Sequence, residues 1–406
     1  MTQSDRSNGQ SNLLRTIVGA NFRANPEFRL VLYDRLPMDQ QELLQDLTKD
    51  PEFYGVLMPS GDSARRTKSA CQNTALLLYS LVEPGPLPAY VQTSLGDEAN
   101  QAVAEMVLDG VLEIEHEGSF ISGTAAYDLI YNSPEPGRIN VPMGQLTRRA
   151  LIYAQMLELS DSSMLSARLY SYNRVPLSTR WRNLFPNSAA VASYLGIDGK
   201  GELRALLGRS WNRVRSTAES EGWFQWSSTT NRSFTEPHTR YKLYVSPTPD
   251  ATSRAFKAVV ESLMNSSAYH FKVGDDAYGI LRPDKIVLYF REFEALQETA
   301  SAIAARLEDC PAQGVPFTAA IGEDGLLSWG VDPPPQNGVM PWQERESWRL
   351  WVVTRIAAAM VVAQQTPDAR LEPWQFALER LRLDKVDTDT WNALPGFGHS
   401  VVLEER

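Results

Sequence analysis

The chain of 406 residues has few of the residue types that build disulfide frameworks and metal sites. Its two cysteines, Cys71 and Cys310, lie far apart, and its four histidines fall at no metal-ligand spacing. The sequence contains no P-loop, no dinucleotide-binding glycine fingerprint and no nucleophile-elbow motif. We therefore expect neither a metal nor a cofactor.

Long apolar runs and an excess of positive charge are also missing. The longest apolar stretches, such as residues 74–81 and 356–363, are too short to span a bilayer, and residues 1–11 lack the apolar core of a signal peptide. The formal net charge of -10 argues against non-specific binding to nucleic acid. We therefore expect a cytoplasmic protein whose partners include no nucleic acid and no membrane.

Helical and strand-like patterns occur in separate runs, which predicts an α+β fold. The N-terminal part is expected to be mostly helical: residues 13–83 have the pattern of helix, loop and helix, and residues 201–220 that of a helix. The predicted segments are a disordered lead-in (1–12), a helical, winged-helix-like domain (13–135), a helical domain (136–238) and an α+β domain with C-terminal helices (239–406).

One segment of the N-terminal part has the order of a winged-helix module. Residues 97–109 have helical spacing, and residues 111–122 alternate and turn at Gly118, which is typical of a hairpin. Such modules serve structural roles, dock peptides or bind DNA. The last role is disfavoured because the hairpin carries three acidic side chains, Glu113, Glu115 and Glu117.

Three short strand-like runs, over residues 241–246, 269–273 and 285–290, occur with the chain's most informative polar side chains. These side chains are Arg240, Lys242, Tyr244, His270, Lys272 and Arg282. Alternation along a strand puts the first three on one face, and His270 and Lys272 on one face of the next strand. Two interpretations fit this pattern: an anion pocket, or solvated charges at strand ends.

A run dense in aromatic residues and arginines extends from Tyr170 to Arg182. Such a run can bind an acidic peptide or a nucleic acid. Tyrosine, tryptophan and arginine side chains also pack seams between helices, and packing is the more common role.

Three motifs resemble those of the phosphothreonine lyases of the type III effector family. They are Lys242-x-Tyr244, Phe271-Lys272-Val273, and Arg282 before a strand with the sequence Val-Leu-Tyr. More closely, the order looks like that of the effector-type lyases found beside kinases in class V lanthipeptide and thioamitide biosynthesis. The similarity covers about residues 240–361. It implies a lyase-like domain that eliminates phosphate from phosphoserine or phosphothreonine in a precursor peptide phosphorylated by a partner kinase.

The resemblance also implies a role for each residue. Lys272 matches the lysine base, and His270 takes the place of a second basic residue that lowers the lysine pKa when charged. Lys242 and Arg282 match phosphate-binding positions, Arg240 assists them, and Tyr244 stands at the general-acid position.

Two departures weaken the match. Ala319 stands where relatives have a cation, and the segment opening the last long helix keeps only a serine and an aromatic residue of the family pattern. Arg349 or Arg355 is positioned in sequence to replace the lost charge. The alternative function is therefore a non-catalytic, peptide-binding partner in a peptide-modifying complex, with a degenerate lyase site. A third, weaker alternative is a regulator that binds DNA through the segment 97–123.

Overall fold

The computed structural model describes residues 17, 19–60, 67–130, 142–199, 201–214, 222–230, 240–333, 346–365, 371–395 and 397. The predicted lead-in (1–12) lies outside these ranges. Helices and strands occupy separate layers, so the predicted α+β class is confirmed. None of the described helices combines the length and the apolar character needed to span a bilayer.

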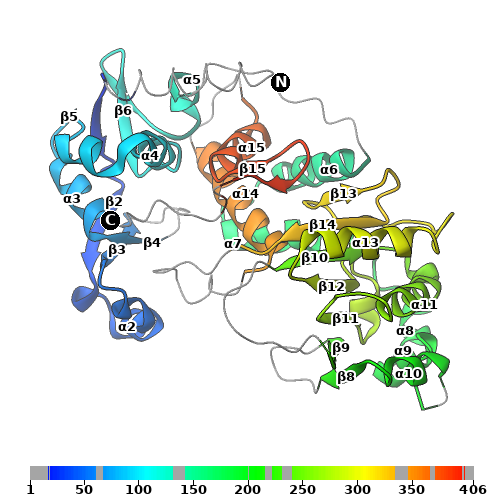
Figure 1. Ribbon diagram of the computed structural model, residues 1–406. Helices are drawn as coiled ribbons and strands as arrows, with labels where there is room; N and C mark the ends of the chain where they lie inside the picture. Colours follow the sequence, from blue (N-terminus) through cyan, green and yellow to red (C-terminus); the bar gives the residue numbers. More distant parts are fainter. Residues whose placement is uncertain are drawn as a thin grey trace.

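The C-terminal half is built on a seven-stranded antiparallel sheet in the order β13-β14-β10-β12-β11-β9-β8 (Figure 1). Its strands are β8 (Trp211–Val214), β9 (Trp223–Ser228), β10 (Tyr241–Val245), β11 (His270–Gly274), β12 (Ile286–Phe290), β13 (Ala319–Ile321) and β14 (Leu327–Val331). The predicted strands at 241–246, 269–273 and 285–290 are therefore present. The helix expected at 201–220 is wrong at residues 211–214, because α10 (Glu202–Leu207) ends before β8 begins, and residues 215–220 lie outside the described ranges.

One face of this sheet is covered by helices and is apolar. Leu243 and Val245 of β10 belong to a buried cluster with Phe256 and Ala300. The helices on this side are α8 (Thr179–Leu184), α9 (Ser188–Tyr194), α10, α11 (Thr252–Leu263) and α13 (Phe293–Ala304), and α13 lies along the strands in Figure 1. Because side chains alternate along a strand, Lys242 and Tyr244 of β10 face the other way.

The opposite side of the sheet approaches a second group of helices. This group comprises α6 (Pro142–Met156), α7 (Ser162–Ser171), α14 (Trp348–Gln365) and α15 (Pro373–Leu383), as the sequence predicted, and its helices share one apolar core. Trp348 at the start of α14 is fully buried, and its indole N–H donates to the carbonyl of Phe317 at 2.8 Å. Its backbone N–H donates to Asp332 Oδ1 at 3.0 Å, just after β14. The first turn of α14 is thereby fixed against the sheet.

The N-terminal part contains more strand than the sequence predicts. A four-stranded sheet has the order β5-β1-β6-β7, and a three-stranded sheet has the order β2-β3-β4. The strands are β1 (Asn21–Ala24), β2 (Phe28–Leu32), β3 (Phe53–Pro59), β4 (Lys68–Cys71), β5 (Gly85–Pro86), β6 (Leu112–His116) and β7 (Ser119–Ile121). The helix–loop–helix expectation for 13–83 is therefore wrong over most of its length, because strands this short give little periodicity to recognise.

The helices of the N-terminal part agree better with prediction. They are α2 (Met38–Leu43), α3 (Gln72–Ser80), α4 (Ala89–Leu108) and α5 (Tyr127–Ile130). The β6–β7 hairpin follows α4 and turns at Glu117 and Gly118, which have φ of 48° and 78° as a tight hairpin turn requires. Helix and hairpin are thus present in the predicted order, and the winged-helix assignment stays a prediction. The remaining elements are α12 (Ala277–Ile280), β15 (Val386–Asp387) and β16 (Asn392–Ala393).

Candidate functional site

The register of the central sheet brings four predicted residues to one face. In one row across that face, Tyr289 of β12 lies between Lys242 of β10 and His270 of β11. In the next row, Val287 of β12 lies between Tyr244 of β10 and Lys272 of β11. The face that carries them is the one that approaches α14.

Lys272 has the properties of a lysine that can accept a proton near neutral pH. Its side chain is partly buried, and its Nζ lies 4.0 Å from the ring centroid of Trp223. Burial and the neighbouring Lys242 ammonium lower the pKa of Lys272 to about 8. Among the residues that the structure describes, none forms a hydrogen bond or an ion pair with this amine. Its lone pair is therefore not committed to a described protein partner when the amine is neutral.

Lys285 offers an informative contrast. Burial lowers the pKa of Lys285 to about 7 as well. However, Lys285 is fully buried, and its Nζ donates to the carbonyl of Pro247 at 2.7 Å and to Gln313 Oε1 at 2.6 Å. It therefore holds loops together, and of the two lysines only Lys272 is available to a ligand.

Arg282 lies at the edge of the same face, held by a carboxylate. Its Nε and Nη2 donate to Asp284 Oδ1 and Oδ2 at 2.8 and 2.9 Å, and Nη2 also approaches Tyr170 Oη at 3.3 Å. Its guanidinium lies 4.9 Å from the ring centroid of Trp223, the ring that Lys272 also contacts. Arg282 and Lys272 therefore converge on one aromatic side chain.

Asp284 joins Arg282 to a second arginine from α14. Nη1 of Arg349 lies 2.9 Å from Asp284 Oδ2, and Nη2 of Arg349 donates to the backbone carbonyl of Tyr170 at 2.9 Å. Burial opposes ionisation of Asp284, but the two arginines hold its pKa well below the ordinary value. The charge proposed for the last long helix is thus present at Arg349. Arg355 instead lies near Glu346 and Asp384, at 3.5 and 3.8 Å.

Lys242 is neutralised by a carboxylate that the sequence analysis did not consider. Its Nζ lies 2.6 Å from Asp332 Oδ2, and both side chains are mostly buried. Asp332 is held in turn by the backbone N–H of Trp348. Three cations, Lys242, Arg282 and Arg349, thus share two carboxylates in this part of the sheet face, which leaves it positive even without Lys272.

His270 and Arg240 do not add to this positive charge in the predicted way. His270 Nε2 lies 3.1 Å from Gln225 Oε1, and Nδ1 lies 3.3 Å from Ser227 Oγ. Burial and the charge of Lys272 lower the pKa of His270 to about 4, so the imidazole is neutral at pH 7. Arg240 directly precedes β10, and its side chain is exposed. The roles of both residues stay predictions.

Tyr244 is buried at the bottom of the sheet face, against Val287 and Val315. Burial, followed by the negative charge of Asp332, raises its pKa well above the ordinary value. A phenol of this kind is a poor proton donor at neutral pH. The general-acid role implied for Tyr244 therefore has no electrostatic support.

The strand register also shows that a cation at position 319 would not belong to the candidate site. Ala319 lies opposite Trp329, which lies opposite Leu243 on the helix-covered face. A cation at position 319 would therefore point away from Lys242 and Lys272.

Several residues of the cluster were not identified from the sequence as site residues. These are Tyr170, Trp223, Asp284 and Asp332. The aromatic and arginine-rich run from Tyr170 was a usable signal, since its first residue contacts both arginines of the cluster. The two aspartates gave no signal, because nothing in the sequence shows which cation each one meets.

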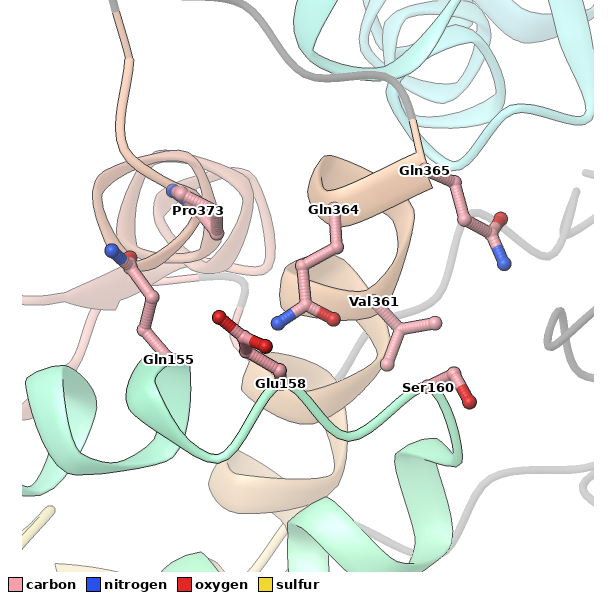
Figure 2. Close-up of a pocket in the computed structure, with 7 residues that line it drawn as sticks. All are labelled: Gln155, Glu158, Ser160, Val361, Gln364, Gln365 and Pro373. Carbon is pink, nitrogen blue, oxygen red and sulfur yellow. The ribbon is translucent and has the colours of Figure 1, made fainter.

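A cavity of about 440 Å³ lies elsewhere, between the end of α6, α14 and the start of α15 (Figure 2). It is lined by Gln155, Glu158, Ser160, Val361, Gln364, Gln365 and Pro373. None of these residues belongs to the cation cluster, so the cavity and the candidate site are distinct.

Comparison with solved structures finds bacterial effectors at low similarity. The effector protein from Pseudomonas syringae pv. syringae strain 61 is 12% identical, with 63% of this chain and 98% of that chain covered and a TM-score of 0.36. The phosphothreonine lyase SpvC from Salmonella is 13% identical, with 51% and 98% covered and a TM-score of 0.28. The type III effector and phosphothreonine lyase OspF from Shigella flexneri is 12% identical, with 30% and 69% covered and a TM-score of 0.26. No protein-family model and no curated protein sequence matches the chain.

Proposed function

We propose that the chain eliminates phosphate from phosphoserine or phosphothreonine in a peptide, leaving a dehydroamino acid. One observation carries this proposal. The partly buried amine of Lys272, with its pKa lowered to about 8, faces a cation cluster and has no hydrogen-bond or ion-pair partner among the described residues. A base beside a positive site is what removal of an α-proton and departure of phosphate both require.

The reaction balances with the residues present. The neutral amine of Lys272 takes the α-proton, and the electrons of the Cα–H bond form the Cα=Cβ double bond. The Cβ–O bond breaks with its electron pair leaving on phosphate, and Lys272 ends as an ammonium. Arg282 has donors left for the phosphate oxygens, because only its Nε and Nη2 are bonded to described residues. Departing phosphate stabilised in this way does not need a proton from Tyr244.

The substrate that fits this proposal is a precursor peptide phosphorylated by a partner kinase. The motifs at Lys242, Lys272 and Arg282 support it, since they resemble those of lyases that act beside kinases in lanthipeptide biosynthesis. The positive sheet face supports it too, because a phosphorylated side chain brings close to two negative charges.

Binding without catalysis is a second candidate function, and one observation favours it. Lys242 is already paired with Asp332, and Arg282 with Asp284 in a bidentate arrangement. Cations satisfied in this way can hold a structure together without turning over a substrate. A peptide-binding partner with a degenerate site would have this appearance.

The two functions are separated by incubating the chain with a phosphothreonine peptide and following the peptide by mass spectrometry. Lys272→Ala should slow elimination by about 10²–10⁴-fold, as loss of a general base does. Lys257→Ala is the matched control, because Lys257 is an exposed lysine on α11, on the other side of the sheet. Unchanged peptide with the wild-type chain would support binding alone, and full activity of Lys272→Ala would refute the base assignment.

A further inference from the structure

Arg174 occupies a fixed position beside the candidate site. The residue before it, Asn173, has a φ of 66°, and its side-chain amide donates to the carbonyls of Gln313 and Gly314 at 2.7 and 2.9 Å. The residue after it, Val175, donates its backbone N–H to the carbonyl of Leu281 at 3.0 Å. The backbone of Arg174 is therefore anchored on both sides, although its side chain is exposed.

This anchoring places Arg174 next to Arg282. The hydrogen bond from Val175 to Leu281 joins two segments of the backbone. Arg174 and Arg282 are the residues next to this bond, one on each segment. Partial burial and the charge of Arg282 both lower the pKa of Arg174, which agrees with the placement of the two residues by the backbone. Two like charges held close by the backbone favour an anion between or beside them.

Arg174 differs from Arg282 and Arg349 in having no carboxylate partner among the described residues. Arg282 and Arg349 both meet Asp284, and even the exposed Arg180 of α8 pairs with Asp250. Among the described residues, no side chain forms a hydrogen bond or an ion pair with the guanidinium of Arg174. The backbone thus holds an exposed cation against a paired one without supplying a described counter-ion.

Three side chains of the candidate site and its surroundings have donors left over. Nη1 of Arg282 has no hydrogen-bond partner among the described residues, Lys272 Nζ has none, and the whole guanidinium of Arg174 has none. An arginine presents five N–H donors, and a phosphate group presents acceptors that match its planar fork. Arg174 is exposed, whereas Lys272 and Arg282 are partly buried.

We propose that Arg174 is an anion-binding residue of the site, which contacts the phosphate from the solvent side while Arg282 and Lys272 contact it from the sheet. This inference rests on the proposed function only for the identity of the anion, a phosphate group, and not on elimination taking place. It gives the site a cation from outside the region that carries the lyase-like motifs.

The test is calorimetric titration of the full chain with inorganic phosphate, which the proposed reaction releases and does not consume. Arg174→Ala should weaken phosphate binding by about 10-fold or more, the usual effect of losing a charged hydrogen bond. Arg174→Lys should recover part of the affinity, since it restores charge but not the fork. Arg168→Ala is the matched control: Arg168 is an exposed arginine on α7, and its loss should leave the affinity unchanged.

The outcomes separate this inference from the proposed function. If Arg174→Ala loses phosphate binding and the wild-type chain never converts a phosphopeptide, the inference is supported and the lyase function is rejected. Elimination by a chain whose phosphate affinity does not change in Arg174→Ala rejects the inference and keeps the lyase. A wild-type chain that binds no phosphate rejects the inference, and so does a loss of affinity in Arg168→Ala as large as that in Arg174→Ala.

Discussion

Asp284 bridges two arginines, and its replacement by asparagine is the sharpest structural perturbation of the site. The carboxylate accepts from Arg282 at 2.8 and 2.9 Å and lies 2.9 Å from Arg349, while only 4% of Asp284 is exposed. Removing one partner of a buried ion pair typically costs about 3–5 kcal/mol, because the remaining charge has no compensation. Asp284→Asn leaves two such cations, so we expect a loss of at least that size in the free energy of unfolding.

The pH dependence of this loss has a defined sign. The pKa of Asp284 is depressed in the folded protein, so its stabilising contribution is present above its unfolded pKa of about 4. That contribution declines as the pH falls below this value. The difference between wild type and Asp284→Asn should therefore be largest near pH 7 and smaller in acid.

Urea unfolding at neutral and acidic pH measures both effects. Asp250→Asn is the control, because its pair with Arg180 is exposed and such pairs contribute about 1 kcal/mol or less. Added phosphate should stabilise Asp284→Asn more than wild type, since the anion can replace the lost carboxylate. A loss below 1 kcal/mol at pH 7, equal to that of the control, would refute the reasoning.

Three further predictions concern the sheet face. A lysine base must be neutral, so the rate of phosphopeptide elimination should rise as the pH is raised through about 8 and then level off; a rate independent of pH over this range would contradict the assignment of Lys272. Burial raises the pKa of Tyr244 well above its ordinary value, so Tyr244→Phe should slow turnover far less than Lys272→Ala; equal losses in kcat would make the phenol an acid catalyst. A Cβ on Gly330 would lie 2.4 Å from Trp348 Cδ1, so Gly330→Ala should destabilise the fold by about 1–3 kcal/mol in urea unfolding; an unchanged midpoint would show that α14 does not pack here as described.

The strands that carry the motifs could be predicted because they alternate cleanly. Lys242 and Tyr244 share a face, as do His270 and Lys272, and period-two alternation is a property of the sequence alone. Arg240 lies just before the first residue of β10, and its predicted place beside Lys242 and Tyr244 stays a prediction. Strand ends come from tertiary pairing, which local periodicity does not report.

The counter-charges of the site could not be predicted from the sequence. Asp332 reaches Lys242 only because β14 pairs with β10, a contact across about ninety residues. Asp284 meets Arg349 only because α14 packs its first turn against the sheet. Counting cations in the sequence therefore overstated how many are free. The predicted domain boundaries near 135 and 238 stay predictions.

The mass of the peptide product tests the central claim most directly. A phosphothreonine peptide incubated with the wild-type chain should lose phosphoric acid and leave the dehydrated peptide, which is one water lighter than the unphosphorylated peptide. The same incubation with Lys272→Ala should form this product about 10²–10⁴-fold more slowly. A product with the mass of the unphosphorylated peptide would indicate hydrolysis. Hydrolysis, or no product from the wild-type chain, would contradict elimination by Lys272.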